Sequence, residues 1–151
     1  MQTKKIYTFI IASLLITMAF STLEANAQCK IFVKSLCVPQ LAPYIHDGGY
    51  QAVMMGEGEE AELYKTIFAG QRYRLFVCSD EIFPNVEFVV SDIRRNILFD
   101  SRKNGNATNW DFKSDASQQI KVTIRIPKSQ KQGSEAEILF GCVGVLFRLL
   151  E

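Results

Sequence analysis

Alternation of apolar and polar residues predicts β-strands over most of the chain after position 50. The clearest run is Gln119–Ile126, in which isoleucine or valine at every second position alternates with Gln, Lys, Thr and Arg. This pattern is typical of a strand with one face in the core and the other in solvent. Gln71–Cys78 has the same period. We therefore expect Tyr73, Leu75 and Val77 to form the core face of a second strand.

Short turns between such runs predict how neighbouring strands pair. Ala61–Phe68 is separated from Gln71–Cys78 only by Ala-Gly, which favours a hairpin. Val86–Asp92 and Asn96–Ser101 are predicted to pair around the turn Ile93–Arg95. Both predictions use local sequence alone.

The final run, Ile138–Leu149, is apolar on both faces around Gly141 and Gly144. It is therefore predicted to lie centrally in a sheet, with the glycines marking a bulge or a close neighbour. Cys29–His46 has no clear period, and we expect a short helical turn or an irregular stretch there. The succession of short strands predicts an all-β fold: a single antiparallel β-sandwich, jelly-roll-like, of about seven to nine strands.

The first 27 residues have the three parts of a secretory signal peptide. Lys4 and Lys5 precede the apolar stretch Ile6–Phe20, and the small-x-small pattern Ala25-Asn26-Ala27 predicts cleavage before Gln28. The mature protein is then one domain, residues 28–151, in the periplasm or secreted. Its longest apolar run is too short for a membrane helix of about 20 residues, so no membrane span is expected in the mature chain.

Charge gives no indication of a nucleic-acid partner. The chain has 17 Lys and Arg against 16 Asp and Glu, a formal net charge of +1. Removal of the signal peptide takes away Lys4, Lys5 and Glu24, which leaves fifteen residues of each sign. A nucleic-acid-binding surface normally shows as a basic excess, so we expect no nucleic-acid partner.

All four cysteines, Cys29, Cys37, Cys78 and Cys142, lie in the exported part. An even number of cysteines in an oxidising compartment predicts two disulfides that stabilise the sandwich. Adjacent strands favour Cys78 with Cys142, leaving Cys29 with Cys37. The other pairings, which tie the N-terminal segment onto the sandwich, are physically as sensible and stay open. No cysteine spacing is typical of a metal centre, and none is predicted.

Trp110 lies between Asn109 and Asp111, an arrangement that could form a stacking platform for a sugar ring, with Tyr44 adding to an aromatic patch at a loop end. These four residues are the candidate ligand-binding set. The alternative is that Trp110 and Phe112 alternate inward as a short strand that packs on the core. The sequence does not decide between the two readings.

Oxygen-rich segments raise the question of a cofactor. The run Glu57–Glu62 holds four carboxylates, and Asp100–Asp111 spaces Asp and Asn residues as loop ligands for calcium. The first is also typical of a solvated face, and turn formation explains the asparagines of the second. No cofactor is predicted, with calcium kept as an alternative. His46, the only histidine, precedes a glycine turn without the neighbours that a catalytic triad needs.

Several of these segments resemble a known family. Tyr73-x-Leu75-x-Val77 after a glycine turn, followed by Val90-x-Asp92-x-x-x-Asn96, is similar to the bacterial pre-peptidase C-terminal type of β-sandwich. With Trp110 and the last strand added, the chain also resembles small secreted proteins of Bacteroidetes-type bacteria. The first resemblance implies a binding or accessory role beside secreted enzymes. The second brings no known catalytic residues to transfer.

The sequence thus favours an exported, non-catalytic binding or accessory module of the cell envelope, which recognises a protein or glycan partner through loop-end residues. Two alternatives stay open. The first is a structural subunit of an envelope or secretion complex, in which the apolar last strand pairs with a partner. The second is a small secreted hydrolase that uses the carboxylates of Glu57–Glu62 or His46.

Overall fold

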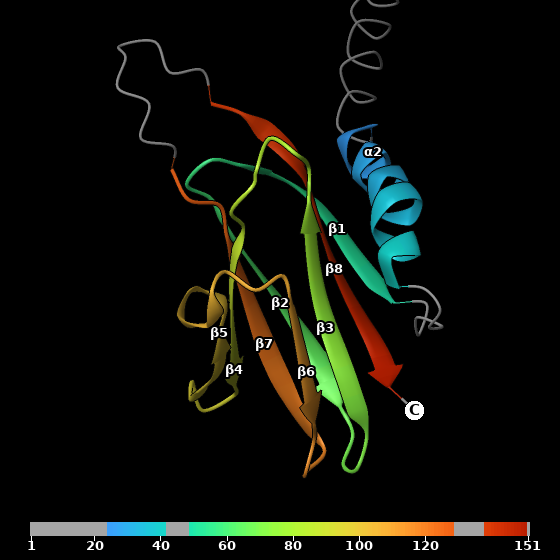
Figure 1. Cartoon of the computed structure of the whole chain (residues 1–151), viewed down its shortest axis with the longest axis vertical. Coiled ribbons are helices and arrows are strands. Elements are labelled where there is room, and N and C mark those ends of the chain that lie inside the picture. Colours follow the sequence, from blue (N-terminus) through green and yellow to red (C-terminus); the bar gives the residue numbers. More distant parts are fainter. Residues whose placement is uncertain (1–23, 42–48, 129–137, 151) are drawn as a thin grey trace, which may run out of the picture.

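The computed structural model of the protein describes residues 24–41, 49–128 and 138–150. In it, two four-stranded antiparallel sheets pack face to face as a β-sandwich (Figure 1). Sheet A has the order β1 (Tyr50–Gly56), β8 (Phe140–Leu150), β3 (Arg72–Ser79) and β6 (Asn109–Lys113). Sheet B has the order β2 (Glu60–Ile67), β7 (Gln118–Arg125), β4 (Glu87–Asp92) and β5 (Ile97–Asp100). The orders 1-8-3-6 and 2-7-4-5 are those of an eight-stranded jelly roll, which confirms the predicted fold class.

The core lies between the sheets and is built from the alternating positions. The four apolar residues of the period-two run, three on β7 and Ile126 directly after it, are all at most 1% exposed, and Tyr73, Leu75 and Val77 on the inward face of β3 are at most 4% exposed. Both core faces expected from the sequence are confirmed. The buried residues of this core are Met55, Ile67, Tyr73, Leu75, Val77, Phe83, Phe88, Val90, Ile120, Val122, Ile124, Ile126, Val143, Val145 and Phe147.

The two strand pairings predicted from turns have different outcomes. β4 pairs with β5 as expected, with Val90 opposite Phe99. The hairpin predicted for β2 and β3 is wrong, because β2 pairs with β7 in sheet B and β3 pairs with β8 and β6 in sheet A. The turn around Gly70 (φ +78°) therefore crosses from one sheet to the other. A two-residue turn is compatible both with a hairpin within one sheet and with a connection between two sheets, so the local sequence did not decide between these connections.

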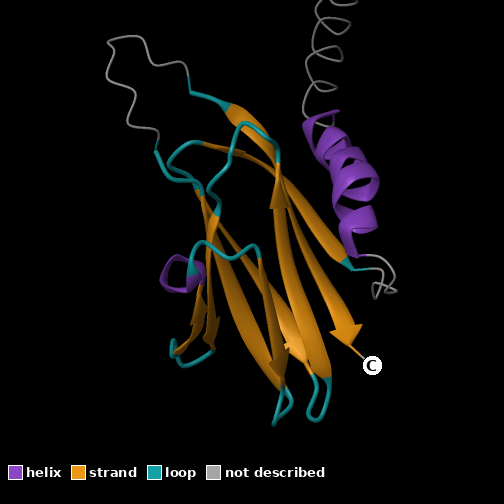
Figure 2. Ribbon diagram, in the orientation of Figure 1, coloured by secondary structure: helices purple, strands orange, loops and turns teal. Residues whose placement is uncertain are grey.

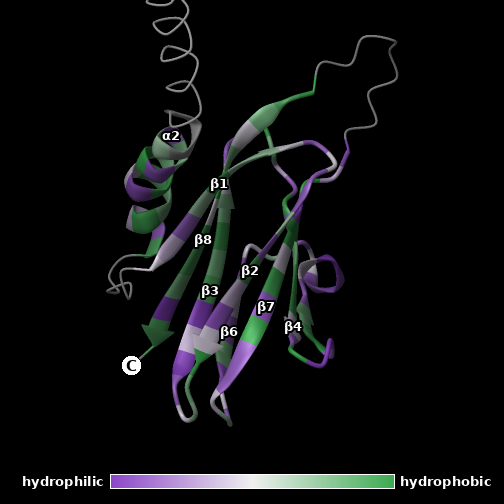
Figure 3. Ribbon diagram, turned by 180° about the vertical axis from the view of Figure 1, so that it is seen from behind, coloured by the Kyte–Doolittle hydropathy of each residue, from purple (hydrophilic) through white to green (hydrophobic). Residues whose placement is uncertain are grey.

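A helical segment covers the β1–β8 part of the outer face of sheet A (Figure 2). Helix α2 (Glu24–Phe32) continues into a π-helical turn, η1 (Val33–Cys37), and a 3-10 turn, η2 (Val38–Leu41). Cys29, Val33, Cys37 and Leu41 are spaced by four residues and are at most 3% exposed. They therefore form one apolar face, which packs on β1 and β8 and is seen from the other side in Figure 3. The expected short helical turn is thus a longer helical segment.

In the part of the chain that the structure describes, no helix has the length and apolarity needed to span a bilayer. The described residues include only the last four of the predicted signal peptide, so the cleavage site stays a prediction.

The disulfides join this helical segment to sheet A. Cys29 is bonded to Cys142 of β8, with Cα atoms 5.1 Å apart, and Cys37 to Cys78 of β3, with Cα atoms 6.0 Å apart. The predicted bonding of four cysteines in two disulfides is confirmed, but the favoured pairing is wrong. Cys78 lies opposite Gly144, two residues from Cys142 along β8. Diagonal neighbours in a sheet are about 7–8 Å apart, which is longer than a disulfide spans well.

The last strand is central, as predicted, because β8 lies between β1 and β3. Its second apolar face is explained by the helical segment, which buries Leu146 outside the sandwich. The glycines mark close neighbours: a Cβ atom at Gly144 would lie 2.5 Å from Cγ2 of Val33. Arg148 follows on the same face and is 1% exposed, and its guanidinium donates a hydrogen bond of 2.9 Å to the carbonyl of Leu41.

Candidate functional site

Trp110 belongs to an aromatic stack inside the sandwich. Its ring stacks on Phe112 at a centroid distance of 4.1 Å and on Phe99 at 5.2 Å. Phe112 continues to Tyr73 on β3, and Phe99 continues to Phe88 on β4, so the stack joins the two sheets. This is the inward packing that the sequence left as an alternative. With Phe112 and Phe99 stacked against it, the Trp110 ring has a structural role in the core, and the sugar platform stays a prediction.

The residues beside Trp110 lie on the opposite, outer face of sheet A. Asn109 is exposed, and the Asp111 carboxylate accepts two hydrogen bonds from the guanidinium of Arg74. This ion pair lowers the pKa of Asp111. Trp110 and its two neighbours thus point to opposite faces of one strand and do not form a single site. Tyr44 and His46 lie outside the described residues.

The carboxylates of Glu57–Glu62 do not converge. The Glu59 carboxylate accepts a hydrogen bond of 2.8 Å from the backbone N–H of Gly56. Glu60 pairs with Arg125, and Glu62 pairs with Lys121 at 2.7 Å, across the β2–β7 ladder. The bond from Lys121 lowers the pKa of Glu62. This arrangement is a charged sheet face, the alternative that the sequence left open, and it offers no pair of carboxyls placed on either side of a substrate.

Asp100, the first oxygen donor of the candidate calcium segment, serves a local structural role. It caps the 3-10 turn η3 (Ser101–Asn104) by accepting from the Arg102 N–H at 3.1 Å, and it also pairs with the Arg102 guanidinium at 2.8 Å. The Arg102 bonds lower the pKa of Asp100. Among the described residues, no three His, Cys, Asp or Glu side chains are grouped as metal ligands. Calcium binding stays a prediction that no observation tests.

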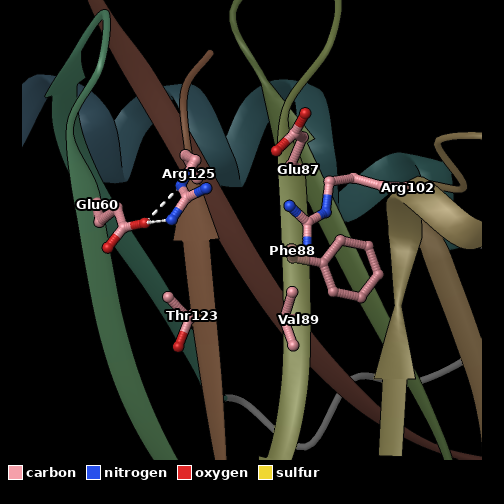
Figure 4. Close-up of a pocket in the computed structure, with 7 residues that line it drawn as sticks. All are labelled: Glu60, Glu87, Phe88, Val89, Arg102, Thr123 and Arg125. Carbon is pink, nitrogen blue, oxygen red and sulfur yellow. Dashed lines mark hydrogen bonds and ion pairs between the residues drawn. The ribbon is translucent and has the colours of Figure 1, made fainter. Parts of the chain in front are cut away.

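Charges of alternating sign cross the outer face of sheet B at one end. Arg125 on β7 lies in register between Glu60 on β2 and Glu87 on β4, and Arg102 follows beyond β4. Figure 4 shows Arg125 turned toward Glu60, with the Glu87 carboxylate above. These residues surround a hollow of about 50 Å³. That volume fits a few waters at most, so we assign the row to cross-strand stabilisation of the sheet.

A larger hollow opens at the same end of the sandwich, where three loops meet. It measures about 270 Å³ and lies between the β1–β2, β3–β4 and β7–β8 connections. Its walls are mainly apolar, and three polar residues line it as well. The apolar residues are Ile82, Phe83, Pro84, Ile126, Pro127 and Leu139, and the polar ones are Glu57, Asn85 and Lys128. We call this feature the loop-end hollow.

Apolar side chains are exposed beside the loop-end hollow. Ile82 is 41% exposed, Ile138 is 60% exposed and Phe140 is 57% exposed. Glycines leave room for them on the two faces of sheet A: a Cβ at Gly56 would lie 2.9 Å from the Phe140 ring and 3.4 Å from Ile138 on the outer face, and one at Gly141 would lie 2.8 Å from Ile82 on the core side. Sequence reasoning missed this surface, because exposed and buried apolar residues look alike in a sequence. The one available signal was the pair of glycines among bulky neighbours.

Comparisons with known proteins give a likeness only among solved structures. No protein-family model and no curated protein matches the sequence. The chain is similar to Aeromonas hydrophila PliG, a periplasmic lysozyme inhibitor of g-type lysozyme, with a TM-score of 0.47 and 11% identity over 68% of this chain and 85% of that one. For Salmonella Typhimurium PliG, an inhibitor of the same type, the values are 0.40, 7%, 66% and 90%. At these values the likeness transfers no residue and no activity to this chain.

Proposed function

We propose that the protein is an exported binding module that captures a partner protein through the loop-end hollow and the exposed apolar residues beside it. The observation that carries the proposal is that Ile82, 41% exposed, lines the apolar hollow, and that Ile138 and Phe140, 60% and 57% exposed, flank its wall residue Leu139. Exposed apolar residues that adjoin one another and are bordered by polar groups are typical of protein–protein interfaces. Charged residues, among them Glu57 and Lys128, border this group.

The size and lining of the loop-end hollow favour a protein partner over a free small molecule. Its volume of about 270 Å³ is below the range of about 300–1,000 Å³ that is usual for ligand pockets. A single protruding side chain of a partner needs less room, and such anchors in pockets dominate the energy of many interfaces. Six of the nine lining residues are apolar, namely aliphatic residues, two prolines and the buried Phe83, which suits an apolar anchor better than a sugar.

Two further observations support export and a non-catalytic role. All four cysteines are in disulfides, a state that persists in oxidising compartments. Three of the four carboxylates proposed for a hydrolase have structural partners: Glu60 is paired with Arg125, Glu62 with Lys121, and Glu59 accepts from the backbone N–H of Gly56. These interactions give the glutamates a structural role in the sheet.

Capture of the partner with matched variants tests the proposal. Mature protein is cross-linked gently in the cell envelope of the producing organism, and its partners are identified by mass spectrometry. Ile138→Ser with Phe140→Ser removes the exposed apolar groups of the loop end. The control is Phe68→Ser, which removes an equally exposed ring, 60%, at the β2–β3 turn on the opposite end.

A partner recovered with the wild type and with Phe68→Ser, but lost with the loop-end variant, is the expected result. Equal recovery by all three proteins overturns the proposal, as does binding to a glycan panel without a protein partner. Inhibition of g-type lysozyme, the partner of the two similar structures, is measured in parallel. A positive result that depends on the loop-end residues would identify the partner class.

A further inference from the structure

Strand β5 is an edge strand whose surface is apolar. It is the last strand of sheet B and pairs with β4, and it lies at the margin of the sandwich in Figure 1. Ile97 is 60% exposed and Leu98 is 40% exposed, and Ile93 in the preceding turn is 69% exposed. An edge strand presents backbone N–H and C=O groups outward, which makes it a template for pairing with another extended segment.

The other edge strands of the sandwich are covered or present polar and charged side chains, whereas Ile97 and Leu98 of β5 are exposed and apolar. β1 is covered by α2. β2 carries charges on its outer face and turns Lys65 inward, with Nζ 5.4 Å from the centre of the Phe147 ring. β6 presents Asn109, Asp111 and Lys113 on its outer face. Charge, cover, short length and bulges all hinder strand addition. β5 has the last two, with four residues and a register shift against β4 between Val90 and Ser91, but it has neither a cover nor charged side chains on the strand surface at Ile97 and Leu98.

The β5 edge is also bordered by positive charge at both ends. Arg94 and Arg95 precede the strand, and Arg102 and Lys103 follow it. The segment 92–103 has four cations and two carboxylates, of which Asp100 is 4% exposed and bound to Arg102. The segment therefore carries a net positive charge on exposed side chains.

The turn before β5 is held in a single conformation. The Asp92 carboxylate accepts hydrogen bonds of 2.8 and 2.7 Å from the backbone and side chain of Asn96. The Arg95 N–H donates to the Asp92 carbonyl at 3.0 Å, and Arg95 has a φ of 68°. A fixed turn reduces the entropy that a partner strand must overcome on binding.

Charge disfavours a second copy of this chain as the occupant. An antiparallel pairing that aligns all four residues of two β5 strands places Arg95 of one copy opposite Arg102 of the other. A parallel pairing places Arg94 beside Arg94 and Lys103 beside Lys103. Like charges in either arrangement are destabilising, whereas carboxylates at the same places are favourable.

We propose that β5 is a docking strand for an extended segment of a partner protein that is apolar in its middle and acidic at both ends. The segment adds to sheet B by backbone hydrogen bonds, and its apolar side chains cover Ile97 and Leu98. This surface is separate from the loop-end hollow, so the proposal stands independently of the function proposed above. Because β5 has only four residues, the contact is short and the affinity is modest.

Peptide binding followed by NMR tests this assignment. The probe is an octapeptide of Val-Thr-Val-Thr with two aspartates at each end, titrated into mature protein labelled with ¹⁵N. Two control peptides have lysine in place of aspartate or N-methylated valines that cannot donate hydrogen bonds. We expect saturable shifts at the amides of 97–100 with the acidic probe, about tenfold weaker binding of the lysine peptide, and none of the N-methylated one.

Matched variants separate edge pairing from general attraction. Ile97→Ser with Leu98→Ser, which leaves the charge unchanged, abolishes binding, while Tyr64→Ser, at a residue 58% exposed on the opposite edge strand of sheet B, leaves it intact. Arg94→Glu with Lys103→Glu reverses the preference so that the lysine peptide binds better. Arg95 is kept because its φ is 68°. Urea unfolding confirms that each variant is folded.

Two results would overturn the proposal. The first is an absence of shifts at 97–100 at saturating probe, or equal affinity for the acidic and lysine peptides. The second is self-association that depends on Ile97 and Leu98, seen as concentration-dependent shifts at the same amides in the wild type. That result would assign the edge to a second copy of the chain.

Discussion

Gly144 allows the helical segment to lie directly on sheet A, and replacing it tests that packing. A methyl group at this position would lie 2.5 Å from Cγ2 of Val33, 3.3 Å from Cγ1 and 3.5 Å from Sγ of Cys37. Carbon atoms in contact are about 3.5–4.0 Å apart, so Val33 must move by about 1 Å. Val33 is fully buried and its segment is held by two disulfides, which limits that movement.

We expect Gly144→Ala to lower the free energy of unfolding by about 1–3 kcal/mol, the usual cost of overpacking. Val33→Ala alone removes two buried methyl groups and is expected to cost about 2 kcal/mol. In the double variant the new methyl occupies the space that Val33 vacates. The destabilisation of the double variant should therefore be smaller than the sum of the two single-variant values by about 1–2 kcal/mol, because the residues are in direct contact.

Guanidinium denaturation of the four proteins, with disulfides intact, measures this coupling. Gly56→Ala is the control, since its Cβ would lie 2.9 Å from the ring of Phe140, a side chain that is 57% exposed and free to move aside. We expect Gly56→Ala to change stability by less than about 0.5 kcal/mol. Additivity of Gly144→Ala and Val33→Ala within about 0.5 kcal/mol would refute the packing described here.

Two further predictions concern single side chains. Trp110→Ala should lower the free energy of unfolding by about 3 kcal/mol, measured by circular dichroism, because the ring is part of the aromatic stack; an unchanged stability would favour the ligand platform instead. Asp100 has a pKa below its ordinary value because of Arg102, so the unfolded chain takes up its proton first as pH falls. The stabilisation is therefore full above about pH 5 and is lost as the pH falls further. Asp100→Asn should flatten the acid limb of stability against pH below about pH 5, and an unchanged limb would show that this pair contributes nothing.

The sequence predicts those parts of the fold in which burial is one-sided. On β7 and along β3 up to Val77 every second residue is buried, so the period in the sequence directly records the core face. The jelly-roll class follows from many such short runs. The pairing of β2 with β7 was not predictable in this way, because a pairing is a choice among distant segments, while a turn such as Ala69-Gly70 reports only a local reversal.

The helical segment and the disulfides were harder to predict for a related reason. The spacing Cys29, Val33, Cys37 and Leu41 did carry a helical signal, with one buried residue every four. Pro39 and the short length obscured it. Two of these residues are the cysteines themselves, so recognising the helix would also have indicated that both bond to a surface facing it. The favoured pairing failed because it treated the cysteines as strand neighbours only.

The candidate site could not be predicted from the alternation of apolar and polar residues, because this alternation does not show which apolar side chains stay exposed. Val143 and Phe140 lie on the same strand and are both apolar, yet the first is buried between the sheets and the second is 57% exposed at the loop end. The helical segment covers one outer face of the sandwich, and cross-strand ion pairs occupy the other. The helical segment and the ion pairs do not extend to the loop-end hollow or to β5, so apolar side chains stay exposed at both places. That is why both proposed binding surfaces follow from the structure and neither follows from the sequence.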